Sequence, residues 1–175
     1  MHHEALTKSG ATIFPKLKQF SDFYLAGGTA LALQIDHRIS VDFDLLCPEN
    51  ISKDLLATVE RVFSESTEEI VPLVNNPDEL SVLVNGIKIT FLRYPFPVLN
   101  KFVDLDGVKS LDIVELSATK AYAIGRRGSF KDYVDLFLII SGGYTDLDAV
   151  ISLANKKYGG EFNSRLFLEQ LHLDL

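Results

Sequence analysis

Two aspartates separated by one residue, Asp42 and Asp44, have the types and spacing to bind a metal ion. In a strand, successive side chains alternate between faces, so both carboxylates would point the same way. The residues that would then point into a core are Val41, Phe43 and Leu45. Two carboxylates on one face repel each other unless a cation lies between them, and hard oxygen ligands suit Mg²⁺ or Mn²⁺. The pattern therefore predicts a divalent-cation site with Asp42 and Asp44 as ligands; the alternative is a solvated strand face.

A glycine pair followed by a threonine, Gly27-Gly28-Thr29, precedes an Ala/Leu-rich run that predicts a short helix over residues 30–34. Glycines let the backbone approach a ligand closely, and the N-terminus of a helix offers free N–H groups to phosphate. A phosphate cradle one short helix away from a carboxylate pair indicates a site for a nucleoside triphosphate and its metal. The alternative is an ordinary tight turn capped by Thr29.

Taken in order, G-G-T, H-R-x-S and D-F-D resemble the signature of the DNA polymerase beta-like nucleotidyltransferase superfamily. They are most similar to the AbiEii/AbiGii group, the toxins of bacterial abortive-infection and type IV toxin–antitoxin systems. That group reads GGTAL, then HR-x-S-x-D-hydrophobic-D-L. The resemblance adds Arg38 and Ser40 to the nucleotide-binding candidates Gly27, Gly28 and Thr29, although Arg38 and Ser40 could also cap and pair locally.

A second stretch, residues 117–136, resembles the same group, which carries K-x-x-A-x-x-x-R and then K/R-D-x-x-D-L. By resemblance, Lys120 contacts nucleotide phosphates, while Asp132 and Asp135 belong to an acidic motif beside the site. Other interpretations stay open. Lys120 could be a solvated lysine, and Asp132 could serve the start of a helix that follows Ser129. Asp135 is a charge within an apolar helix, and it could form a structural ion pair with Lys120, Arg126 or Arg127.

The resemblance implies a metal-dependent enzyme that transfers a nucleoside monophosphate from an NTP to an acceptor. Asp42, Asp44, Lys120 and Asp135 would be its catalytic residues, and Mg²⁺ or Mn²⁺ its cofactor. It also implies a DNA-binding antitoxin as partner and, in some members, an RNA acceptor such as tRNA.

One departure concerns the third carboxylate that polymerase-beta-like enzymes usually carry on a neighbouring strand. The expected position here is the strand around residues 87–91, whose polar face offers Lys88 and Thr90 but no acid. Asp132 or Asp135 could substitute, or the attacking hydroxyl could be activated otherwise. The missing acid motivates one rival function, a nucleotide-binding or interaction protein with weak turnover. A second rival is a nucleotidyltransferase acting on a small molecule of the antibiotic type, and the acidic balance of the chain suits a cationic substrate of that kind.

Composition predicts one cytoplasmic domain. The chain has 175 residues, 47% of them hydrophobic, a single cysteine and a net charge of −7. A core of ample size fits this length, and the net charge argues against a surface for nonspecific nucleic-acid binding. One cysteine excludes an internal disulfide and fits a reducing compartment. We find no apolar run of the roughly 20 residues that a membrane crossing needs, and no signal-peptide pattern near the start.

Periodicity and turn signals predict an α+β fold, a nucleotidyltransferase-like mixed palm sheet flanked by helices and followed by a helical part. We expect a single nucleotidyltransferase domain over 1–175, with its sheet part over about 1–110 and its helical part over about 111–175. Asn85-Gly86 predicts a hairpin turn. The expected strands cover residues 23–25, 41–45, 69–74, 80–84, 87–94 and, in extended form, 102–106. The expected helices cover residues 4–20 with a break at Pro15, 30–34, 52–63, 113–127, 130–140, 146–158 and 161–171.

Overall fold

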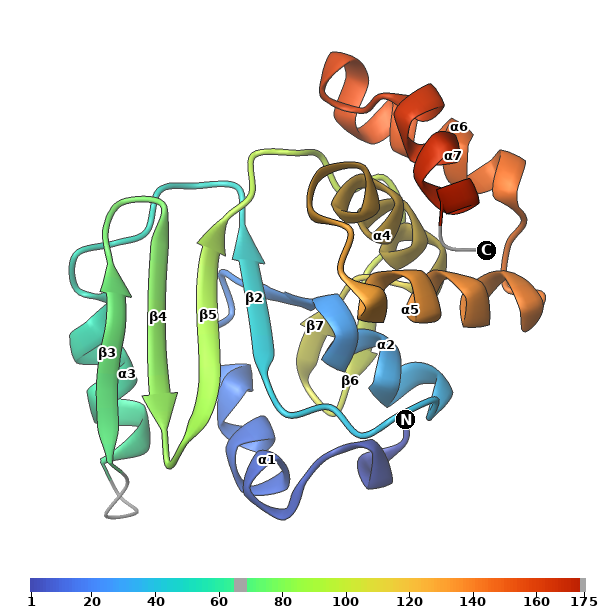
Figure 1. Ribbon diagram of the computed structural model, residues 1–175. Coiled ribbons are helices and arrows are strands. Elements are labelled where there is room, and N and C mark those ends of the chain that lie inside the picture. Colours follow the sequence, from blue (N-terminus) through green and yellow to red (C-terminus); the bar gives the residue numbers. More distant parts are fainter. Residues whose placement is uncertain (65–68, 174–175) are drawn as a thin grey trace. The chain divides into compact units, whose positions relative to one another are not determined.

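The computed structural model describes residues 1–64 and 69–173. Contacts divide the chain into two compact units. The first unit comprises residues 1–95 and 102–110, and the second comprises residues 96–101 and 111–175. A seven-stranded sheet belongs to the first unit, and four α-helices belong to the second (Figure 1).

The sheet is mixed, with strand order β3-β4-β5-β2-β1-β7-β6. Parallel pairs join β2 to β5 and β1 to β7, and the remaining neighbours are antiparallel. The strands are β1 Tyr24–Ala26, β2 Phe43–Cys47, β3 Ile70–Asn75, β4 Glu79–Val84, β5 Ile87–Arg93, β6 Val103–Leu105 and β7 Val108–Ser110. A mixed sheet followed by helices confirms the expected α+β class.

The β4–β5 hairpin turns at Asn85-Gly86, as the sequence predicted. Both residues have positive φ, 49° and 79°, which a two-residue turn of type I′ requires. Asp106-Gly107 repeats the arrangement with φ of 51° and 88° and joins β6 to β7. The sequence analysis expected an extended segment over residues 102–106 but not β7, because three residues are too few to show an alternation of apolar and polar side chains.

Three short helices open the first unit, where the sequence predicted helix over residues 4–20 with a break at Pro15. Thr7 caps the second of them by accepting a hydrogen bond from the Gly10 N–H at 3.0 Å. Pro15 starts a separate 3₁₀ turn, since it lacks an N–H and cannot continue a helix. The helices of this unit are η1 His3–Ala5, α1 Lys8–Ile13, η2 Phe14–Gln19, α2 Gly27–Ile35 and α3 Leu55–Phe63.

An aromatic core lies on one face of the sheet, with α3 behind β3 and β4 in Figure 1. Phe43 of β2 stacks against Phe14 at 6.2 Å, and Phe91 of β5 meets Phe20 edge-on at 4.9 Å. Phe43 and Leu45 are buried, as predicted, but Val41 is 45% exposed. The expectation for Val41 was wrong because β2 begins only at Phe43, and Val41 belongs to the preceding loop.

Helices of the second unit follow the predicted boundaries closely. They are α4 Ile113–Arg127, α5 Phe130–Ser141, α6 Leu147–Tyr158, η3 Gly159–Glu161 and α7 Ser164–Leu173. Asp112 caps α4 by accepting from the Glu115 N–H at 2.7 Å, and Gly128 ends it with φ of 54°. The start that differs most from the expected one is that of α7, which begins at Ser164, after the η3 turn, and not at residue 161.

A buried ion pair, which the sequence reasoning missed, fixes the segment 96–101 to these helices. Glu115 and Lys157, both inaccessible to solvent in their side chains, lie 2.6 Å apart. Glu115 also accepts from the N–H groups of Leu99 and Asn100, at 3.0 and 2.7 Å. A buried carboxylate with this many donors stabilises the segment because each donor is satisfied.

In the part of the chain that the structure describes, no helix combines the length and the apolarity required to cross a membrane.

Candidate functional site

The glycine turn lies at the junction of β1 and α2. The helix begins directly at Gly27, which has φ of 69°, a conformation that glycine adopts without strain. The preceding residue, Ala26, supplies no side-chain cap to the first turn of α2. The N–H groups of a first turn have no intrahelical acceptor, so this end of α2 can serve an anion.

Two side chains lie directly against the glycines. A Cβ placed on Gly27 would come within 2.5 Å of Oδ2 of Asp44. A Cβ placed on Gly28 would overlap the guanidinium of Arg38, whose Cζ would be 3.1 Å away. The sequence predicted a close approach at this turn and assigned it to a ligand. The structure shows that a carboxylate and a guanidinium of the protein already make such an approach.

The two aspartates differ in their surroundings. Asp44 lies in β2, beside Ala26 of β1 and Thr90 of β5, and is half-buried. Asp42 precedes the strand and is exposed. Oδ2 of Asp44 lies close to Gly27, the first residue of α2, and the backbone carbonyl of Asp42 accepts from Thr29 in the same turn. Mg²⁺ is commonly held by one or two carboxylates plus substrate phosphates, so these residues fit such an ion.

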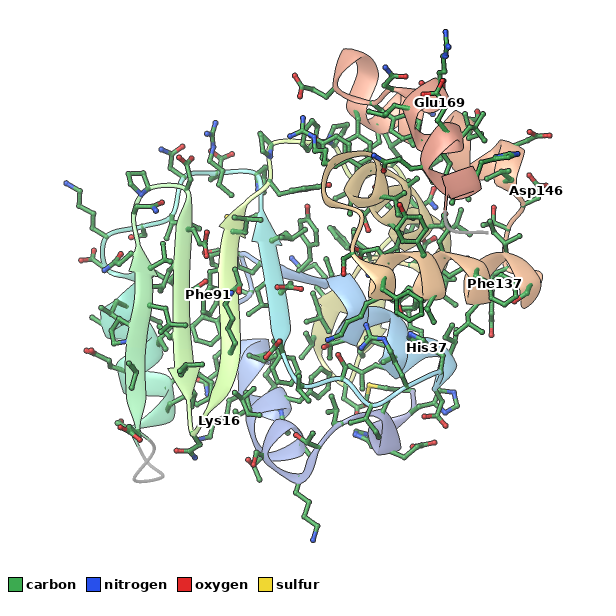
Figure 2. The ribbon with its side chains drawn as sticks, viewed as in Figure 1. Lys16, His37, Phe91, Phe137, Asp146 and Glu169 are labelled. Carbon is green, nitrogen blue, oxygen red and sulfur yellow. The ribbon has the colours of Figure 1, made fainter. Side chains whose placement is uncertain are left out.

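Thr29 and Ser40 hold the loop that leads to Asp42. Their hydroxyl oxygens lie 2.6 Å apart, and Thr29 also donates to the backbone carbonyl of Asp42. Both are buried, at 3% and 6% exposure. That they contact nucleotide stays a prediction, while their observed contacts position an aspartate. His37 lies in the loop after α2 (Figure 2).

Lys120, Asp132 and Asp135 form a buried cluster within the second unit. Nζ of Lys120 lies 2.9 Å from Oδ1 of Asp132 and 2.7 Å from Oδ2 of Asp135. The three residues are exposed by only 5%, 3% and 0%. The interpretation of Lys120 as a solvated lysine is therefore wrong, and Lys120 is a partner of Asp135, as one of the open alternatives held.

Of the other cations named for Asp135, Arg126 pairs instead with Glu161 at 2.7 Å and lies over the ring of Tyr122 at 4.5 Å. The side chain of Arg127 lies outside the described part of the chain. Ser129 makes no side-chain hydrogen bond to the first turn of α5. The structure thus brings the predicted residues together in two groups, one in each unit.

The neighbouring strand β5 carries Thr90 at the position directly beside Asp44. Thr90 in turn pairs with Ser81 of β4, and Ser81 donates a hydrogen bond to Glu79 at 2.6 Å. The sequence reasoning predicted Thr90 on this face but missed Ser81 and Glu79. The signal was available, because Glu79 and Ser81 alternate with the apolar residues of the predicted hairpin.

Cys47 ends β2 as a buried thiol. Its Sγ donates to the carbonyl of Glu49 at 3.2 Å, and burial raises the pKa of the thiol. The thiolate is the nucleophilic form, so the observed environment favours a packing role over thiol chemistry.

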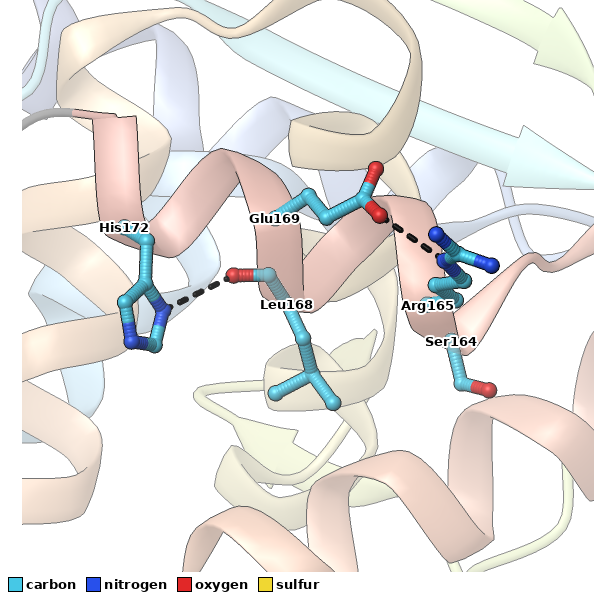
Figure 3. A pocket seen from close by; sticks show the side chains of 5 residues that line it. All are labelled: Ser164, Arg165, Leu168, Glu169 and His172. Carbon is cyan, nitrogen blue, oxygen red and sulfur yellow. Dashed lines mark hydrogen bonds and ion pairs between the residues drawn. The ribbon is translucent and has the colours of Figure 1, made fainter.

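Two surface hollows are lined by other residues. One, of about 660 Å³, is lined by five residues of α7: Ser164, Arg165, Leu168, Glu169 and His172 (Figure 3). Arg165 and Glu169 form an exposed ion pair there at 2.8 Å, one helical turn apart. The other hollow, of about 550 Å³, lies between the end of β2 and the start of α3.

Solved structures with the same fold include three proteins of 14–18% sequence identity to this chain. JHP933 from Helicobacter pylori has a TM-score of 0.59, 18% identity, and coverage of 96% of this chain and 90% of that one. The antibiotic-resistance factor ANT(2'')-Ia has a TM-score of 0.57, 14% identity, and coverage of 93% and 96%. The Megavirus polyadenylate synthase has a TM-score of 0.55, 15% identity, and coverage of 74% and 30%, so this chain spans less than a third of that enzyme.

Sequence comparison identifies the family. An uncharacterized protein of Aquifex aeolicus (strain VF5), aq_aa25, is 35% identical over 141 residues, which cover 79% of this chain and 67% of the relative. A family model described as "Nucleotidyl transferase AbiEii toxin, Type IV TA system" matches residues 11–175. Together with the fold, this match shows that the chain belongs to the AbiEii nucleotidyl transferase toxin family.

Proposed function

We propose that this protein is a metal-dependent nucleotidyltransferase, which moves a nucleoside monophosphate from an NTP to an acceptor hydroxyl. The observation that carries the proposal is the close approach at the α2 N-terminus, where Asp44 and Arg38 lie against Gly27 and Gly28. A guanidinium and free N–H groups suit a triphosphate, and a carboxylate beside them suits its metal ion.

Each residue of the first group has a role that follows from its contacts. Asp42 and Asp44 would hold Mg²⁺ or Mn²⁺. When bound, the metal neutralises charge on the triphosphate and on the departing pyrophosphate. Arg38 and the bare backbone of Gly28 would orient the phosphates. Thr29 and Ser40 fasten the loop of Asp42 through its backbone carbonyl, which would help to place the carboxylate for the metal.

For the second group we propose a scaffolding role in place of the expected contact with nucleotide. Lys120 is committed to Asp132 and Asp135 at ion-pair distances, and all three are nearly inaccessible. A lysine that binds phosphate must present its ammonium group to the ligand. In the observed arrangement the ammonium group faces two carboxylates instead.

Our proposals for the acceptor and the partner rest on membership of the family. Type IV toxin–antitoxin membership implies an antitoxin partner, and we propose that this partner is a DNA-binding protein. We propose an RNA such as tRNA as acceptor, and the cytoplasm as the compartment. ANT(2'')-Ia, which shares the fold, is an antibiotic-resistance factor by its description, so a small-molecule acceptor is the rival that an acceptor screen tests.

Asp42→Ala tests the metal assignment. We expect this variant to lose Mg²⁺-dependent NTP binding while its melting temperature changes little, because Asp42 is exposed and its removal relieves repulsion from Asp44. Isothermal titration with each of the four NTPs, with Mg²⁺ and with EDTA, measures the effect. Unchanged affinity in Mg²⁺ would overturn the assignment. Tight binding by the wild type with no pyrophosphate release would instead favour a nucleotide-binding protein.

Gly28→Val tests the phosphate cradle. The new side chain would occupy the volume of the Arg38 guanidinium, which is the end of a flexible side chain and can move away. We therefore expect a folded protein whose NTP affinity falls by at least about tenfold, roughly the 1.4 kcal/mol of one charge-assisted contact.

Gly125→Ala is the matched control for Gly28→Val, because a Cβ at this position in α4 meets nothing within 4 Å. It should bind NTP as the wild type does. If Gly28→Val also bound normally while melting at the wild-type temperature, the turn would have no part in phosphate binding.

A further inference from the structure

The geometry points to a proton relay, Thr90–Ser81–Glu79, that takes the proton of the acceptor hydroxyl in place of the third carboxylate. This inference rests on the proposed nucleotidyl transfer. All three residues lie in the sheet of the first unit, on the face that carries Asp44.

Strand register places the start of the relay. Asp44 of β2 and Thr90 of β5 are direct partners in a parallel pair. Neighbouring strands lie about 4.8 Å apart, and partners in register share a face, so the side chain of Thr90 neighbours that of Asp44, which is proposed to hold metal. This is the position where the superfamily's third acid was expected. A threonine hydroxyl cannot act as the final base, since it is no stronger a base than the hydroxyl that it would deprotonate.

The relay continues across the sheet. Ser81 of β4 is the register partner of Thr90, and their hydroxyl oxygens lie 3.4 Å apart. Ser81 donates to Oε1 of Glu79 at 2.6 Å, a short bond to a carboxylate. A hydroxyl both donates and accepts and can rotate, so Ser81 can receive a proton from Thr90 while it passes its own to Glu79.

The burial of its hydroxyl groups distinguishes the relay from an ordinary polar surface. Ser81 is fully buried and Thr90 is 8% exposed, whereas Glu79 at the far end is half-exposed. A buried hydroxyl in the middle of a strand costs free energy unless it is hydrogen-bonded, and valine or alanine would carry no such cost. The two buried hydroxyls of Thr90 and Ser81 therefore connect the position beside Asp44 to the solvent-accessible carboxylate of Glu79.

The proposed step balances as follows. The acceptor oxygen forms a bond to the α-phosphorus, and the bond from that phosphorus to the bridging oxygen of pyrophosphate breaks. Pyrophosphate leaves with the electron pair. The acceptor proton passes to Oγ1 of Thr90, the Thr90 proton passes to Oγ of Ser81, and the Ser81 proton passes to Oε1 of Glu79. Thr90 is then the catalytic residue, and Ser81 and Glu79 act through it.

The test measures transfer and binding on the same variants of the full chain. The probe is each α-labelled NTP with Mg²⁺ and total bacterial tRNA as the source of hydroxyls. Positioned acid–base groups contribute about 10²–10⁴-fold, so Glu79→Gln and Thr90→Val should each lower single-turnover transfer by about 10²-fold or more. Mg²⁺·NTP affinity should stay within about twofold of the wild type by isothermal titration.

Two variants separate the relay from a packing role. Thr90→Ser keeps the hydroxyl and should restore most of the transfer that Thr90→Val loses. Asp78→Asn, next to Glu79 but paired with Arg93 at 3.1 Å, should transfer at the wild-type rate. Normal transfer by folded Glu79→Gln, or a Thr90→Ser variant as slow as Thr90→Val, would overturn the relay alone. A wild-type protein that binds NTP but never releases pyrophosphate would overturn both the relay and the transferase.

Discussion

Asp44→Asn should lower nucleotidyl transfer by about 10³-fold or more. A metal ion on the reacting phosphate is worth several kcal/mol in the transition state, and each 1.4 kcal/mol is about a factor of ten in rate. Asn has nearly the shape of Asp, so the contact with Gly27 persists while the charge that would hold the metal is lost. The measurement is single-turnover transfer at saturating Mg²⁺·NTP, with melting temperature recorded beside it.

A second substitution of Asp44 and a control variant show whether the lower transfer rate of Asp44→Asn is due to the loss of a metal ion. Asp44→Cys should be inactive with Mg²⁺ and recover part of its rate with Mn²⁺ or Cd²⁺, because a thiolate prefers softer ions. Asp104→Asn is the control, since that aspartate lies in β6 and accepts from the Gly107 N–H, which an amide oxygen can also do. If Asp44→Asn transferred at more than a tenth of the wild-type rate, Asp44 would not be the principal metal ligand.

Local signals in the sequence were enough to predict the class of fold. Asn85-Gly86 specified a hairpin because both residues adopt positive φ, and Asp112 and Gly128 delimit α4 at the predicted residues. The break expected at Pro15 is confirmed, because Pro15 lies in the first turn of a separate 3₁₀ helix. The earlier break was missed, because apolar periodicity over residues 4–20 outweighed the cap at Thr7. Strand β7 was not predicted because its three residues are too few to show a periodic pattern.

Contacts distant in sequence could not be predicted in the same way. Glu115 and Lys157 are 42 residues apart, and nothing in either segment indicates the other. The packing of Arg38 on Gly28 depends on how the loop after α2 returns, which the spacing does not fix. By contrast, residue types and order alone were enough to identify the two aspartates and the glycine pair as candidates. The structure adds the row of hydroxyls beyond Thr90.

Lys120→Met should lower the free energy of unfolding by about 3–5 kcal/mol, because it leaves two buried carboxylates without their shared cation. At this chain length each kcal/mol shifts the melting temperature by roughly 2–4 °C, so the drop should be on the order of 10 °C. Arg165→Met is the control, since its pair with Glu169 is on the surface and surface pairs are worth about 0–1 kcal/mol. If the melting temperature of Lys120→Met lay within about 2 °C of that of the wild type, the cluster would add little to stability.

Asp135→Asn then decides between scaffold and catalysis. The loss of stability should be smaller than for Lys120→Met, because Lys120 keeps its 2.9 Å partner Asp132 and the amide can still accept a hydrogen bond. If Asp135 is a scaffold residue, the folded variant transfers nucleotide at a rate close to that of the wild type. If it is catalytic, transfer falls by several orders of magnitude at nearly unchanged melting temperature. Zero exposure and a 2.7 Å ion pair with Lys120 favour the first outcome, because a carboxylate held by an internal cation is not available to an acceptor hydroxyl.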